Sequence, residues 1–274
     1  MTSVTASKGI RAAGRGGRAR EITARCGLAT RGVLYVLIGT LALRVAFGDP
    51  GAQEADRQGA LQELAGTPFG GALIWAVGLG FVCMMLWRLS EALTGAAGPD
   101  GGKPTKRLAA AGRTVFYATV AYSVLTFAAG GGGSSGDAQS RDVTAKALDL
   151  PAGQFLVGAA GIGIAVAGVV IGVQAARRTF RKHLSMGGVP QHWRKGVEFL
   201  GVAGGLARGA VFAAAGAFVL YAAVRYDPAQ SKGIDDTLRS FTGTAAGPWL
   251  LVAVALGLAL FGVFSWALAR WREV

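Results

Sequence analysis

Three arginines stand near the start of three long apolar segments, and each is followed four residues later by an aromatic residue. The pairs are Arg31 with Tyr35, Arg113 with Tyr117, and Arg208 with Phe212. Residues four apart share one face of a helix, so each ring can stack on its guanidinium group. A cation at the edge of a membrane span can pair with lipid phosphates, and a ring of such cations favours anions. The chemistry that these residues indicate is therefore the binding of an anionic lipid or of a small anion.

Residue patterns typical of catalysis and of metal binding are missing from the sequence. It contains no Walker loop, nucleophile elbow, dinucleotide fingerprint, HExxH or CxxC motif. Cys26 and Cys83 have no companion ligands, and His183 and His192 lie apart without a carboxylate or thiol beside them in the sequence. We therefore expect a protein that is not an enzyme, with no catalytic residues, no metal and no cofactor.

The composition is that of a membrane protein. Of the 274 residues, 52% are hydrophobic and 16% are charged, whereas soluble domains carry about 25% charged residues. Apolar runs of about 20 residues are long enough to cross a hydrocarbon core of about 30 Å. Such runs lie at about 32–47, 69–87, 108–129, 152–176, 199–224 and 248–269. The expected fold class is an all-α membrane protein with six transmembrane helices.

Basic residues are distributed unevenly between the two sides of this arrangement. The 28 lysines and arginines give a net charge of +13, and most of them lie before the first run, in alternate connections or after the last run. These are Lys8, Arg11, Arg15, Arg18, Arg20, Arg25, Lys103, Lys106, Arg107, Arg177, Arg178, Arg181, Lys182, Arg194, Lys195, Arg270 and Arg272. The positive-inside rule places both termini and these connections in the cytoplasm. Because topology explains the charge, we expect anionic lipid headgroups on the cytoplasmic side as partners, and no nucleic acid. The sequence leaves a membrane-protein partner open.

The chain consists of three tandem copies of one helical hairpin. Aligning the three arginines brings the small residues Gly39, Ala121 and Gly216 into register eight positions further on. Two crossings per copy return the chain to its starting side, so the copies should pack around a pseudo-threefold axis along the membrane normal. The expected units are a basic flexible cytoplasmic tail (1–23) and hairpin repeats at 24–95, 107–184 and 199–273.

The outer loops of the three copies end in similar segments, at 56–70, 141–153 and 233–248. Each segment contains an acidic residue, followed by leucines at amphipathic spacing and then by small residues with Pro or Gly. We therefore expect these three segments to be equivalent within the repeats.

At this level the sequence resembles a known membrane family. The motif G-x-x-x-R-G-x-x-Y at Gly27–Tyr35, its echo at Gly204–Phe212 and the three-hairpin pattern are similar to the mainly actinobacterial family catalogued as domain of unknown function 1206. The second copy departs from the motif at Ala109 and Thr114. The resemblance covers nearly the whole chain after the basic tail. It implies a multi-pass protein of the bacterial plasma membrane and carries no established activity.

Two glycine patterns indicate close helix packing. Lipid tails are as apolar as Leu, so helices in a membrane associate where small residues let their backbones approach. Such residues are Gly201, Gly205 and Gly209 in the fifth run and Gly168 and Gly172 in the fourth.

The basic loop between the fourth and fifth runs is expected to lie at the membrane interface and to attract anionic lipid. Its cations are Arg177, Arg178, Arg181, Lys182, Arg194 and Lys195.

Two interpretations of the three arginines remain open. In the first, they are topology anchors that pair with lipid phosphates or neighbouring carbonyl groups, in an uncharacterised membrane protein that interacts with lipid or with a membrane partner. In the second, they form an inward-facing ring at the cytoplasmic mouth of a central cavity, in a small-anion transporter or pore. The direction in which the arginines point distinguishes the two.

Overall fold

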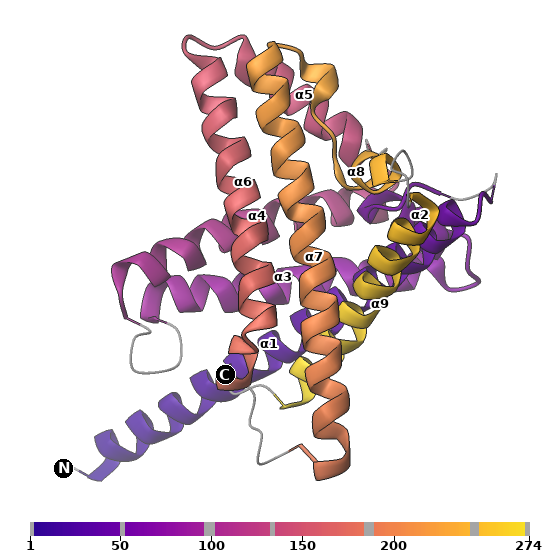
Figure 1. The fold of residues 1–274 in the computed structure, drawn as a ribbon. Helices are drawn as coiled ribbons and strands as arrows, with labels where there is room; N and C mark the ends of the chain where they lie inside the picture. The colour runs from indigo at the N-terminus through magenta and orange to yellow at the C-terminus, as the bar shows by residue number, and fades with distance from the viewer. Residues whose placement is uncertain are drawn as a thin grey trace.

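The chain is helical, with no strand, throughout the part that a computed structural model describes, residues 3–49, 53–95, 102–131, 135–183, 189–241 and 247–271 (Figure 1). Side chains are described there except for those of residues 3–17, 182 and 183. The long helices are α1 (Ser3–Ala46), α3 (Gly70–Thr94), α4 (Pro104–Ala128), α6 (Gly153–Ala176), α7 (Gln191–Arg225) and α9 (Gly247–Trp271). The short elements are α2 (Arg57–Ala65), α5 (Gly136–Leu148), η1 (Thr179–His183), η2 (Pro228–Gln230) and α8 (Ile234–Ser240).

Six helices in the described part are long and apolar enough to cross a membrane, at 18–46, 70–94, 104–128, 153–176, 191–225 and 247–271. The expected all-α, six-span membrane fold is thereby confirmed. Most of the expected tail at 1–23 belongs to α1, which is helical from Ser3 onward.

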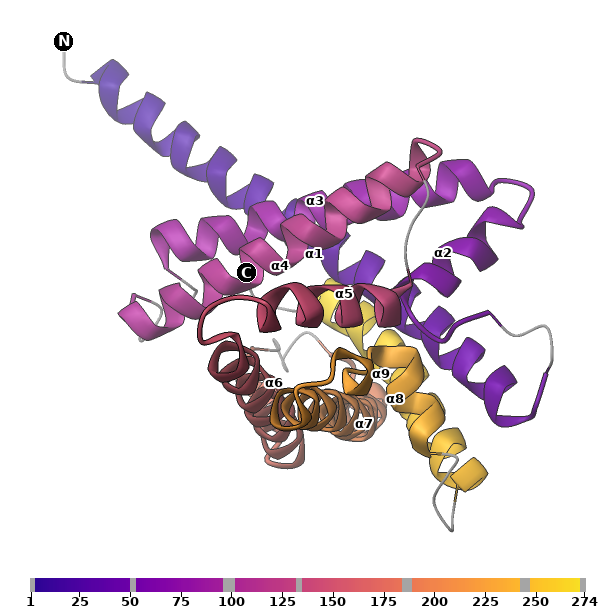
Figure 2. The ribbon, with the colours of Figure 1, turned by 90° about the horizontal axis from the view of Figure 1, so that it is seen from above.

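Three helix pairs make up the body of the protein. The most extensive contacts join α3 to α4, α6 to α7 and α9 to α1, so each pair combines the second span of one repeat with the first span of the next. The pairs are steeply inclined to one another (Figures 1 and 2). Within a repeat, α1 contacts α3 and α7 contacts α9, whereas α4 and α6 make almost no contact over their described residues. The hairpins are therefore open, and the hairpin of the second repeat is open most widely.

The expected glycine contacts bring α6 and α7 together. A Cβ atom added to Gly209 would lie 2.8 Å from the carbonyl oxygen of Gly168 and 2.8 Å from the backbone nitrogen of Gly172. One added to Gly201 would lie 2.6 Å from the ring of Phe180, and one added to Gly205 would collide with Ala175. Only backbones without side chains can approach this closely, which is why small residues recur at this interface.

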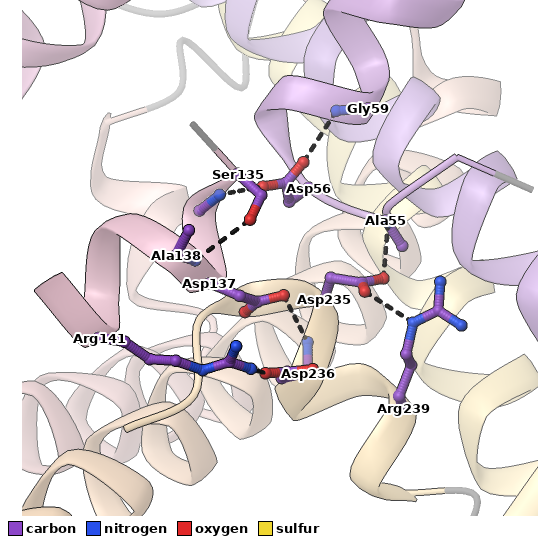
Figure 3. Close-up of polar contacts among 11 residues, drawn as sticks. Ala55, Asp56, Gly59, Ser135, Asp137, Ala138, Arg141, Asp235, Asp236 and Arg239 are labelled. Atoms are coloured by element: carbon purple, nitrogen blue, oxygen red, sulfur yellow. Dashed lines mark hydrogen bonds and ion pairs between the residues drawn. The ribbon is translucent and has the colours of Figure 1, made fainter. Parts of the chain in front are cut away.

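The end of the bundle opposite Arg31, Arg113 and Arg208 carries α2, α5 and α8, one short helix from each repeat, and we call it the outer end (Figures 1 and 2). Near the start of each helix stands an aspartate, and we call Asp56, Asp137 and Asp235 the aspartate ring (Figure 3). All three are buried.

Each aspartate of the ring accepts a hydrogen bond from the backbone of the next repeat. Asp56 Oδ2 accepts from Gly136 N at 2.7 Å, Asp137 Oδ2 from Asp236 N at 3.1 Å, and Asp235 Oδ1 from Ala55 N at 2.7 Å (Figure 3). The bonds run from the first repeat to the second, the second to the third, and the third back to the first. A carboxylate bonded to a backbone N–H forms a comparatively strong hydrogen bond, so the ring fastens the three repeats together.

The ring corrects the expected register of the second repeat. The residue that corresponds to Asp56 and Asp235 is Asp137, in the first turn of α5, and not an acid of the 141–153 segment. Asp142 lies in the middle of that helix and is exposed. The spacing in the sequence agrees with this correspondence, because Asp56, Asp137 and Asp235 lie 25, 24 and 27 residues after Arg31, Arg113 and Arg208.

Candidate functional site

A cavity of about 420 Å³ lies inside the bundle, toward the end opposite the aspartate ring. Four of its described lining residues are arginines: Arg31, Arg88, Arg113 and Arg208. The remaining walls are largely apolar and include Phe116, Tyr117, Ile171, Phe180, Phe212, Phe261, Phe264 and Leu268. The three arginines singled out by the repeat thus converge on one space, and we call it the arginine cavity.

Arg31, on α1, is fixed from α9. Its Nε donates a hydrogen bond to Ser265 Oγ at 3.2 Å, and its guanidinium carbon lies 5.1 Å from the centre of the Phe261 ring. Ser265 is fully buried, and its hydroxyl donates to the carbonyl oxygen of Phe261 at 2.9 Å. A serine that bonds its own helix backbone has few alternative rotamers, so it holds the buried guanidinium in place.

Arg208, on α7, is surrounded by aromatic rings. Its guanidinium carbon lies 5.0 Å from the ring centre of Phe261, 5.3 Å from that of Phe212 and 5.7 Å from that of Tyr35. The buried Nε atom has no hydrogen-bond partner. Aromatic faces stabilise a guanidinium group without occupying its N–H donors, so this side chain retains donors for a ligand.

The other two arginines differ in their surroundings. Arg88 is buried on α3, where it pairs with Glu91 at 2.6 Å and stacks over the Trp87 ring at 4.1 Å. Residues three apart lie on one face of a helix, which brings these two side chains together. Arg113, on α4, is exposed and lines the cavity.

The predicted aromatic partners are placed differently from the expected i,i+4 stacks. Phe212 does lie beside the arginine of its own repeat, Arg208. Tyr35, however, lies under Arg208 from another repeat, and the Tyr117 hydroxyl lies close to Arg31. The first spans of the three repeats, α1, α4 and α7, converge at the arginine cavity, so each tyrosine reaches an arginine on the first span of another repeat.

The basic loop beside the cavity is held by one acid on α7. Arg178 and Arg181 both lie 3.3 Å from Glu198, and Arg194 Nε donates to the Val189 carbonyl oxygen at 3.1 Å. Arg177 and Lys195 are exposed, whereas the side chain of Lys182 lies outside the described residues. Exposed cations at this end of the bundle remain compatible with the expected attraction to anionic lipid.

Several residues of the cavity were not identified from the sequence. Phe261 contacts both Arg31 and Arg208, Ser265 positions Arg31, and Phe180 packs at 5.0 Å against Phe264. Phe261 and Ser265 are four residues apart on α9, so the face they share was visible in principle. Nothing in an apolar span indicates which of its faces meets an arginine from another repeat.

The fold and the cavity define a multi-pass helical membrane protein with three internal repeats and a basic interior site. Residues 26–95, 108–178 and 203–272 each match the family described as Domain of Unknown Function (DUF1206), and the chain belongs to this family. It is also 28% identical over 243 residues to the uncharacterized protein YxxB of Bacillus subtilis strain 168, an alignment that covers 88% of this chain and 87% of the relative. No solved structure matches the chain.

Proposed function

We propose that the protein is a non-catalytic membrane protein that binds the anionic headgroup of a lipid in the arginine cavity. The observation that carries the proposal is the convergence of Arg31, Arg88, Arg113 and Arg208 on one apolar-walled space. Among the described contacts of these four arginines, Glu91 is the carboxylate that forms an ion pair, and its partner is Arg88. Like charges in a poorly solvated site repel one another strongly, and a phosphate would relieve that repulsion.

The shape of the cavity favours a lipid over a free anion. Phe116 and Ile171 lie on α4 and α6, the two spans of the second repeat that make almost no contact, and both line the cavity. Phe116 is 56% exposed, on a surface that would face lipid in the membrane. A headgroup on the arginines could therefore extend its acyl chains outward between α4 and α6. Under the positive-inside rule both termini are cytoplasmic, so the lipid would come from the cytoplasmic leaflet of the bacterial plasma membrane.

A small-anion transporter remains the second candidate, because it would use the same arginines. The aspartate ring argues against a continuous path through the bundle. An anion that left the arginine cavity along the pseudo-threefold axis would reach Asp56, Asp137 and Asp235, which repel it.

The proposal is tested by binding measurements on the whole protein in neutral detergent. Native mass spectrometry with phosphatidylglycerol and phosphatidylcholine should show preferential retention of the anionic lipid. Arg208→Gln should weaken that retention by about tenfold, since it removes charge-assisted hydrogen bonds. Arg225→Gln removes the same charge from the other end of α7, where Arg225 bonds Tyr221 outside the cavity, and should leave retention unchanged. Equal retention of the two lipids, or an equal loss in both variants, would contradict the proposal.

Two further arms separate the sources of the anion. Inorganic phosphate that bound as tightly as the lipid and displaced it would assign the cavity to a free anion. Anion flux in proteoliposomes that was lost in the triple variant Arg31→Ala, Arg113→Ala, Arg208→Ala would favour the transporter. Parent protein without flux would remove the transporter as a candidate.

A further inference from the structure

One oxygen of the aspartate ring stands out from the others. Asp56 accepts bonds through both oxygens, from Gly59 N at 2.9 Å and Gly136 N at 2.7 Å, and both oxygens of Asp235 are also bonded. Asp137 uses Oδ2 for the bond from Asp236 N, whereas its Oδ1 is buried and has no hydrogen-bond partner. The residue is 5% exposed. A buried carboxylate oxygen without a donor is costly, and a bound cation would satisfy it.

Two other carboxylates lie beside the Asp137 side chain. Asp137, Asp235 and Asp236 each offer one carboxylate oxygen, and the three oxygens lie within 4.8 Å of one another (Figure 3). Calcium binds oxygen ligands at about 2.3–2.6 Å, so ligands on one ion lie at most about 5 Å apart. The spacing of the three oxygens is therefore compatible with a single ion between them.

The charges around the ring leave a deficit of positive charge. Five acids gather there: Glu54, Asp56, Asp137, Asp235 and Asp236. Arg239 lies 2.6 Å from Asp235, and Arg141 forms an ion pair with Asp236. The nearby Arg57 directs its guanidinium group to Ser123 Oγ at 3.2 Å and to Gln139, not to a carboxylate. Even with all three arginines counted, the group carries two more negative charges than positive ones, which a divalent cation would balance.

The pKa shifts of two of these acids agree with the excess of negative charge. Burial and the neighbouring Asp236 raise the pKa of Asp137 from 3.8 to about 6. Burial and Asp56 likewise raise the pKa of Glu54. Both shifts express the difficulty of keeping these carboxylates charged without a further cation.

We propose that Asp137, Asp235 and Asp236 bind a calcium ion at the outer end of the bundle. The ligands come from α5 and α8, so the ion would join the second repeat to the third at the place where the ring already holds them. Donors that are all carboxylate oxygens suit a hard cation and do not suit zinc or copper. An irregular set with one exposed side suits calcium better than magnesium, which demands near-octahedral geometry.

The experiment uses the whole protein in detergent after treatment with EDTA. Calorimetric titration with CaCl₂ should give one site per chain, and 2 mM calcium should raise Tm by about 5 °C. Asp137→Asn should abolish both the binding heat and the shift in Tm. Asp142→Asn changes an exposed acid on the same helix and should retain the full response. Asp236→Asn, at a more exposed ligand, should weaken binding and provides a second variant if Asp137→Asn does not fold.

Several outcomes would overturn the calcium site. Parent protein without binding heat and without a shift in Tm is the most direct of them. A shift that NaCl of equal ionic strength reproduces would show charge screening instead of binding. A response to MgCl₂ as large as that to CaCl₂, or a full response in both Asp137→Asn and Asp236→Asn, would also contradict it.

Discussion

The two ends of the bundle use charged residues from the same three repeats in opposite ways. At the outer end, the aspartates point across repeat boundaries and bond to backbone N–H groups of the next repeat. At the inner end, Arg31, Arg113 and Arg208 line a common space. Their described partners are mainly aromatic rings and a serine, with no carboxylate directly bonded to these three in the contacts above.

The difference follows from side-chain length and from the groups that are bonded. An aspartate has a short side chain, so it bonds to backbone donors that pack directly against it, and these bonds occupy most of its acceptor sites. An arginine has a long stem and five N–H donors, so it can extend into a cavity and keep donors free. The outer ring should therefore determine stability, while the inner cavity should determine binding.

The largest expected effect belongs to Asp56 in the outer ring. Asp56→Ala removes the acceptor of two backbone N–H groups and the N-cap of α2, so we expect a loss of about 4 kcal/mol in the free energy of unfolding. Unfolding in mixed micelles with SDS, followed by tryptophan fluorescence, measures it. Asp142→Ala, at an exposed position, should change the stability by less than about 0.5 kcal/mol.

Added anionic lipid should not restore the stability of the Asp56→Ala variant. The ring and the cavity lie at opposite ends of the spans, so occupation of the cavity cannot replace the missing bonds. Rescue of this variant by phosphatidylglycerol would show that the two ends are coupled and would break the comparison.

At the inner end, by contrast, anionic lipid should partly restore the stability that is lost when Glu91 is replaced. Glu91→Gln leaves the buried Arg88 without its counter-charge, and we expect a loss of about 3 kcal/mol. The same change raises the net positive charge of the cavity, so an anionic lipid should bind more tightly and recover part of that stability. SDS unfolding with and without phosphatidylglycerol tests both effects. If the lipid stabilises the variant no more than the parent, the arginine cavity is not where the headgroup binds.

A smaller effect is expected for Ser265, which positions Arg31. Ser265→Ala removes the acceptor for Arg31 Nε, so the stability should fall by about 1.5 kcal/mol and the lipid affinity by about threefold. Ser90→Ala is a matched control, because its hydroxyl bonds the Trp87 carbonyl oxygen within α3 and the described contacts give it no arginine partner. A loss of affinity in Ser90→Ala as large as that in Ser265→Ala would argue for a general loosening of the helices.

The sequence predicted the fold because the membrane imposes it. Apolar run length and the positions of basic residues define the spans, and the recurrence of Arg31, Arg113 and Arg208 defines the repeats. Glycines were expected to pack, and Gly168, Gly205 and Gly209 do so at the α6–α7 interface, while Gly201 packs against Phe180 of η1.

The tertiary relationships could not be predicted in the same way. Which helices pair depends on interfaces between repeats, so Phe261 and Ser265 were overlooked although they lie against Arg31. Asp137 recurs nearly in register, 24 residues after Arg113 where Asp56 lies 25 residues after Arg31, but this spacing does not show that its partner lies in the next repeat. A single sequence shows which residues recur, whereas their partners depend on how the repeats are inclined.

The smallest effect is expected for Arg44, at the other end of the helix that carries Arg31. Arg44 bonds Asp49 at 2.8 Å and Glu63 at 3.2 Å, and its side chain is 40% exposed. Exposed ion pairs are worth little, so Arg44→Gln should affect the stability less than any of the variants above and should leave lipid retention unchanged. Native mass spectrometry and SDS unfolding on this variant provide the check. Because Arg31 and Arg44 share α1, a loss of lipid binding in Arg44→Gln would mean that charge anywhere on the helix attracts the lipid, and that the cavity contributes no specificity.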